Sequence, residues 1–129
     1  MSHPQLTLSV LPNSYAVCRL QPGAPVPAWA SRGEFWSVVR TKDELSIVCD
    51  ESSVPVDQSR EGGWRLLKLE GPFAFTLTGI LASVAQPLAE AGVSIFALST
   101  FDTDYVLVKA AQLETARQAL HLYGHTVRE

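Results

Sequence analysis

The chain has 129 residues, of which 47% are hydrophobic and 18% charged, a balance typical of a folded globular protein and not of a disordered one. Its net charge is -3 and its ten Lys and Arg residues are scattered, which argues against a nucleic-acid-binding surface. No stretch approaches the roughly eighteen apolar residues that span a bilayer, and the start MSHPQLTLSV does not resemble a signal peptide. We therefore expect a cytoplasmic protein with no membrane partner.

The first half of the sequence is predicted to be rich in strands. Short apolar or alternating runs predict strands over residues 6–11, 15–20, 35–41 and 44–50. The connection between the second and third strands carries three prolines and two glycines within residues 21–33, which excludes a long helix there. The polar segment 52–63, with its Gly and Pro residues, indicates a boundary between two halves.

The second half has the order strand, helix, strand, strand, helix, strand. The strands are predicted over residues 64–70, 93–99, 105–109 and 125–129, and the helices over 77–91 and 112–123. Gly92 is expected to end the first helix in a left-handed conformation, and Pro87 to bend that helix. This order is typical of the split, ferredoxin-like α+β fold, an antiparallel sheet with two helices on one face.

The two halves are interpreted as two copies of this arrangement. The first half has a similar strand hairpin but lacks a clear first helix. We therefore expect a degenerate N-terminal module over residues 1–61 and a complete C-terminal module over residues 62–129.

The sequence offers little that is typical of a catalytic or metal-binding site. Cys18 and Cys49 each lie within an apolar run, where a free thiol behaves as a small buried hydrophobe, and they lack metal-ligand spacing. His121 and His125 are four residues apart but have no acidic partner nearby in the sequence. We expect no catalytic residues, no metal, no cofactor and no enzyme activity.

The start of the first long helix is one candidate ligand site. Thr76 or Thr78 is placed to cap this helix, and Gly79 lets a ligand approach the backbone. The amides of the first turn, at Gly79, Ile80 and Leu81, attract an anion such as a carboxylate. The alternative is ordinary helix capping, which nearly every helix needs.

The polar segment STFDTD, residues 99–104, is the second candidate because it interrupts two strands of almost wholly apolar character. Asp102 or Asp104 there is able to hold the ammonium group of an amino acid. The alternative is a tight hairpin in which Asp and Thr serve as turn formers. In the split fold the two candidate segments lie near each other at one edge, so together they suit a small zwitterion.

The stretch 79–108, GILASVAQPLAEAGVSIFALSTFDTDYVLV, resembles the ACT-domain proteins built from paired modules. It is similar to small bacterial tandem-ACT proteins and to the eukaryotic cytosolic arginine sensors. The resemblance implies an α+β fold of two tandem ACT modules, the first one degenerate. It also implies ligand-binding positions at Gly79, Ile80, Leu81, Thr100, Phe101 and Asp104.

The function implied by the resemblance is the non-catalytic, regulatory binding of a free amino acid at a module or dimer interface. A homodimer and a separate effector protein are the expected partners. The stretch FAFTLTG has no acidic residue after Glu70 to grip an arginine side chain, so the identity of the amino acid is left open. The alternative function is a protein-protein interaction or assembly module without a ligand.

Overall fold

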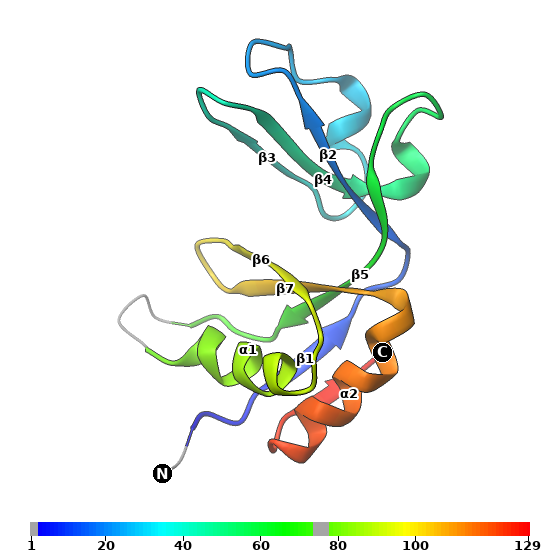
Figure 1. Ribbon diagram of the computed structural model, residues 1–129. Coiled ribbons are helices and arrows are strands. Elements are labelled where there is room, and N and C mark those ends of the chain that lie inside the picture. The colour runs from blue at the N-terminus through cyan, green and yellow to red at the C-terminus, as the bar shows by residue number, and fades with distance from the viewer. Residues whose placement is uncertain (1–2, 74–77) are drawn as a thin grey trace. The chain divides into compact units, whose positions relative to one another are not determined.

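The computed structural model describes residues 3–73 and 78–129 (Figure 1). The described residues form two compact units. The N-terminal unit consists of residues 13–64, and the C-terminal unit combines residues 3–12 with the described residues from 65 to 129. The long strand β5 (Glu61–Leu69) contributes its first residues to the N-terminal unit and the others to the C-terminal unit.

The C-terminal unit contains a mixed five-stranded sheet with the strand order β6-β7-β5-β1-β8. Besides β5, the strands are β1 (Thr7–Val10), β6 (Ile95–Ser99), β7 (Asp104–Lys109) and β8 (Thr126–Arg128). Strand β1 lies between β5 and β8, with Leu8 opposite Leu69 in an antiparallel pair and opposite Val127 in a parallel pair. Residues 7–10 thus form an interior strand of the sheet of the second half.

Two helices, α1 (Ile80–Glu90) and α2 (Leu113–Leu122), cover one face of this sheet (Figure 1). A single 3-10 turn, Ala110–Gln112, precedes α2. Alternate residues of the central strands point to the helices because successive side chains of a strand face opposite sides. The resulting core consists of Leu6, Leu8, Val10, Leu67, Leu69, Val84, Leu88, Val93, Val106, Val108, Ala116 and Leu120.

The N-terminal unit has the strand order β3-β4-β2-β5, and every neighbouring pair is antiparallel. Its own strands are β2 (Tyr15–Leu20), β3 (Ser37–Arg40) and β4 (Leu45–Asp50). Two 3-10 turns, Ala28–Ser31 and Glu51–Ser53, occupy the connections before β3 and after β4. Its core is small: Ala16, Cys18, Ala30, Leu45, Ile47, Cys49 and Val54.

The expected α+β class is confirmed, and so are the hairpin β6–β7 and the left-handed cap of α1 at Gly92, whose φ is 76°. Helix α1 is shorter than the predicted span 77–91, because it begins at Ile80. Strand β1 lies within the range 1–61 that the sequence pattern predicts as one module. It pairs with β5 and β8, and Leu8 and Val10 contribute to the core of the C-terminal unit.

Candidate functional site

Two connections of the C-terminal unit meet at one end of its sheet. The backbone N–H of Phe73, in the segment after β5, donates to the carbonyl oxygen of Asp102 in the β6–β7 turn at 2.9 Å. The hydroxyl of Thr103 donates to the carbonyl oxygen of Leu69, at the end of β5, at 2.5 Å. The structure therefore brings the end of β5 and the residues directly after it next to the acidic turn.

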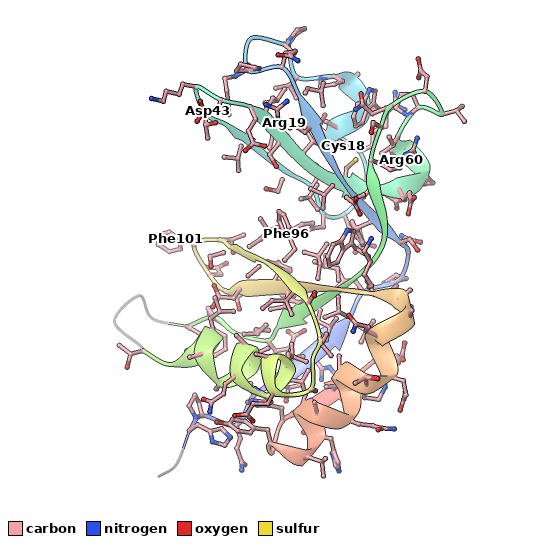
Figure 2. All side chains as sticks on the ribbon, in the orientation of Figure 1. Cys18, Arg19, Asp43, Arg60, Phe96 and Phe101 are labelled. Atoms are coloured by element: carbon pink, nitrogen blue, oxygen red, sulfur yellow. The ribbon has the colours of Figure 1, made fainter. Side chains whose placement is uncertain are left out.

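The β6–β7 turn is closed by its two threonines. The backbone N–H of Thr100 donates to the carbonyl oxygen of Thr103 at 2.8 Å, and the Thr100 hydroxyl donates to the same oxygen at 3.1 Å. Thr103 is buried, whereas Phe101, at the tip of the hairpin, has 78% of its surface exposed (Figure 2). Thr100 and Thr103 thus act as turn formers, which is the alternative reading of this segment.

The two aspartates of the turn differ in their surroundings. Asp104 is the first residue of β7, is half-buried, and accepts a hydrogen bond from the Ser99 hydroxyl. Asp102 is exposed, and within residues 3–73 and 78–129 only its backbone oxygen is bound, by Phe73. Asp102 is therefore the carboxylate of this turn that is available to a ligand without loss of an existing bond.

The start of α1 differs from the prediction. Gly79 itself occupies the N-cap position in a left-handed conformation with φ of 79°, and no described side chain caps the helix. Thr78 is therefore not the cap, and Thr76 lies outside the described residues. Ile80 and Leu81 pack against the core with their side chains. Only their backbone amides, beside the exposed Gly79, are suited to an anion.

A small pocket lies where the two connections meet. Its volume is about 120 Å³, and its lining residues are Lys68, Gly71, Pro72, Asp102 and Thr103. The peptide bond between Gly71 and Pro72 is cis. Of the described residues that the sequence singled out, only Asp102 lines this pocket. Lys68 was missed, although a single charge between the apolar Leu67 and Leu69 is the signal of a side chain on the opposite face of the strand.

The cysteines are not suited to nucleophilic chemistry. Both are free and buried, Cys18 on β2 (Figure 2) and Cys49 on β4. Burial raises the pKa of Cys18, and it raises the pKa of Cys49 to about 11, with a further contribution from Cys18. Because the thiolate is the reactive form, a raised pKa leaves these groups inert near neutral pH.

Within residues 3–73 and 78–129, no cluster of three or more His, Cys, Asp or Glu side chains is arranged to hold a metal ion. The helices of this same part of the chain are all too short or too polar to cross a bilayer.

The C-terminal unit defines the class of the protein, an α+β domain with two helices on one face of a mixed sheet. Residues 59–122 match the family model of the ACT domain, and the chain belongs to the ACT-domain proteins. Residues 13–57 match a second family model, described as an N-terminal domain.

Three comparisons place the chain among known proteins. It is 33% identical over 101 residues to the cytosolic arginine sensor for mTORC1 subunit 1 of Bos taurus, covering 70% of this chain and 31% of that protein. The crystal structure of an Agobacterium tumefaciens protein is 44% identical, has a TM-score of 0.93, and is matched over 98% of this chain and 95% of that one. The regulatory subunit of aspartate kinase from Thermus flavus is 10% identical with a TM-score of 0.61, over 95% of this chain and 99% of that one, and shows the fold alone. The chain spans about a third of the length of the arginine sensors that it matches.

Proposed function

We propose that this protein is a non-catalytic regulatory module that binds a free amino acid at a module or dimer interface and acts in the cytoplasm through an effector protein. The arginine-sensor relative supports a regulatory role. The observation that carries the proposal is the hydrogen bond from Phe73 to Asp102, since it joins the segment before α1 to the acidic turn. A zwitterion needs groups from both segments.

We further propose that the N-terminal unit is a degenerate ACT module. Its order β3-β4-β2-β5 is that of a split ferredoxin-like sheet, and 3-10 turns stand where that fold has helices. The degenerate module would then comprise residues 13–64, and the complete module would include β1 as an additional strand. In this division the degenerate module is inserted between β1 and the other residues of the complete module, in place of a single boundary at residue 61.

The proposed ligand set combines backbone and side-chain groups. The amides of Gly79, Ile80 and Leu81 are suited to a carboxylate, because the start of a helix carries partial positive charge. Asp104 and Asp102 are suited to an ammonium group, with Thr100 and Phe101 beside them in the turn. Thr78 adjoins the helix start and is exposed.

A thermal-shift screen of the twenty free amino acids tests the proposal. A ligand that binds the folded state raises the midpoint of unfolding with concentration. We expect a saturable shift with at least one amino acid and a smaller shift in the Asp104→Asn variant, which keeps an acceptor for Ser99 but loses the charge. Asp57→Asn, at an exposed position of the N-terminal unit, is the matched control. A properly folded protein that responds to none of the twenty contradicts the proposal.

The alternative function is assembly without a ligand. Two large apolar side chains of the C-terminal unit favour it, since Phe101 is 78% and Leu122 is 86% exposed. An assembly module should self-associate in analytical ultracentrifugation and dissociate when these residues are replaced by serine. It should keep its oligomeric state in Asp104→Ala, which removes a carboxylate of the proposed ligand site.

A further inference from the structure

We infer that the pocket lined by Lys68 and Asp102 is the subsite for the charged end of an α-amino acid: Lys68 binds its carboxylate and Asp102 its ammonium group. This inference rests on the proposed function and deepens it, because it assigns the main-chain groups of the ligand to two named side chains. For the carboxylate it names a lysine that the sequence pattern did not single out, as an alternative to the amides of α1.

The pocket has the size of a compact ligand. Its volume is about 120 Å³, well above the roughly 10–15 Å³ that one water molecule needs by the same measure. This space accommodates the ammonium, the α-carbon and the carboxylate of an amino acid with a small side chain, such as glycine, alanine or serine. A long side chain would have to extend out of the pocket.

The charges around the pocket complement a zwitterion. Lys68 and Asp102 both line it, yet they form no ion pair with each other or with another residue of the described part of the chain. A lysine ammonium donates up to three hydrogen bonds, and an ionised carboxylate only accepts them. Each group therefore has capacity for the oppositely charged end of a ligand that lies between them.

The neighbouring acid does not compete for Lys68. Glu70 lies two residues further along the chain and accepts a hydrogen bond from the Ser9 hydroxyl at 2.6 Å. Its carboxylate also lies 3.8 Å from the guanidinium of Arg128. Glu70 thus interacts with residues of β1 and β8 and not with Lys68, which lines the pocket.

The backbone fixes the spacing of the two charged residues. Lys68 lies on β5 between Leu67 and Leu69, which are fully buried in the core. Asp102 lies in the turn that is attached to the end of β5 by the hydrogen bond from Thr103 to Leu69. The two side chains thus project from one rigid framework, which lowers the cost of ordering them around a ligand.

The test uses isothermal titration calorimetry of the full chain with each free amino acid, and with the N-acetyl and amide derivatives of whichever amino acid binds. Loss of a charge-assisted hydrogen bond weakens binding about tenfold or more. We therefore expect that the amino acid binds at least about tenfold more tightly to the unaltered protein than either derivative does.

Two variants assign the contacts. Lys68→Met should bind the amino acid about tenfold more weakly and lose its preference over the amide, which lacks the carboxylate. Asp102→Asn should show the same weakening and lose the preference over the N-acetyl form, which lacks the ammonium. Lys42→Met and Asp57→Asn, at exposed positions of the N-terminal unit, should bind as the unaltered protein does. If Lys68 or Asp102 had only a structural role, its replacement would weaken the binding of the amino acid and of both derivatives by the same factor.

The outcomes separate this inference from the proposed function. If the unaltered protein binds an amino acid but Lys68→Met and Asp102→Asn retain its affinity, the inference is overturned and the proposed function stands. Equal affinity of the unaltered protein for the amino acid and its two derivatives overturns the inference even if a variant fails to fold. If none of the twenty amino acids binds, both fail.

Discussion

His125 donates a hydrogen bond from its Nε2 atom, at 2.8 Å, to the carbonyl oxygen of Ser83 in helix α1. Residue 87, whose N–H would normally bind that oxygen, is a proline and has none. The Nδ1 atom of His125 accepts from the backbone N–H of Leu6 at 3.0 Å, so the neutral ring must carry its proton on Nε2. The buried histidine thus supplies the donor that Pro87 removes from the helix.

His125→Ala is expected to lower the free energy of unfolding by about 2–4 kcal/mol, because it leaves two buried backbone groups without partners. Urea denaturation measures this. Introducing Pro87→Ala restores an N–H to the helix, so the same histidine change should cost clearly less in that background. Identical costs in both backgrounds would show that Pro87 and His125 act independently.

Cys49 should make the protein less stable in alkali. Burial raises the pKa of its thiol to about 11 in the folded state, above the ordinary value of 9.0. The folded state therefore holds the proton more tightly, and this stabilisation is complete below pH 9 and is lost as the pH rises toward 11. Urea denaturation at about pH 8 and about pH 10.5 should show a smaller alkaline loss in Cys49→Ala than in the unaltered protein. An equal loss in the two proteins contradicts the assignment.

Leu8→Ala tests whether β1 belongs to the C-terminal unit. Leu8 is fully buried in that unit's core, so the change should cost about 2–5 kcal/mol. Hydrogen exchange should accelerate first at β8, whose Val127 lies opposite Leu8. Faster exchange confined to residues 13–61 would instead support a module over residues 1–61. Val56→Ala, at a side chain that is 99% exposed, is the control.

Arg40 holds the proline-rich connection of the N-terminal unit. Its guanidinium donates to the carbonyl oxygens of Pro22 and Ala24. In Arg40→Lys a single ammonium replaces this planar pair of donors, so limited proteolysis should cut residues 21–33 faster. The global free energy of unfolding should change by less than about 1 kcal/mol, because the side chain is exposed. Unchanged cleavage there would mean that the connection does not depend on Arg40.

The sequence predicted those helices and turns that depend on residues close together in the chain. The apolar spacing and Gly92 predicted helix α1, and the interruption at residues 99–104 predicted the β6–β7 turn. The partners of β1 were not predictable in this way, because strand pairing over a long sequence separation leaves no periodicity in the strand itself. The second half reads as a complete module without it.

The place of the acidic turn in the fold was predicted to the same extent, whereas the ligand-binding role of its residues stays a prediction. The acidic turn and its closeness to the segment before α1 follow from the order of the elements. The roles of individual side chains depend on which face of a strand or turn they occupy. Thr103 is buried against the Leu69 carbonyl, Thr78 does not cap α1, and Lys68 lines the pocket. Only the three-dimensional register settles such details.

The interior position of β1, between β5 and β8, determines how the protein can be divided into fragments. A fragment that starts at residue 62 keeps β5 and β8 but lacks the strand that hydrogen-bonds to both. The position between β5 and β8 is then empty, and a strand that fills it must run antiparallel to β5 and parallel to β8. The core of this fragment also lacks the side chains of Leu8 and Val10. A synthetic peptide of residues 3–12 should therefore bind to such a fragment by adding the missing strand. The fragment and the peptide together would form a split protein whose assembly reports their association.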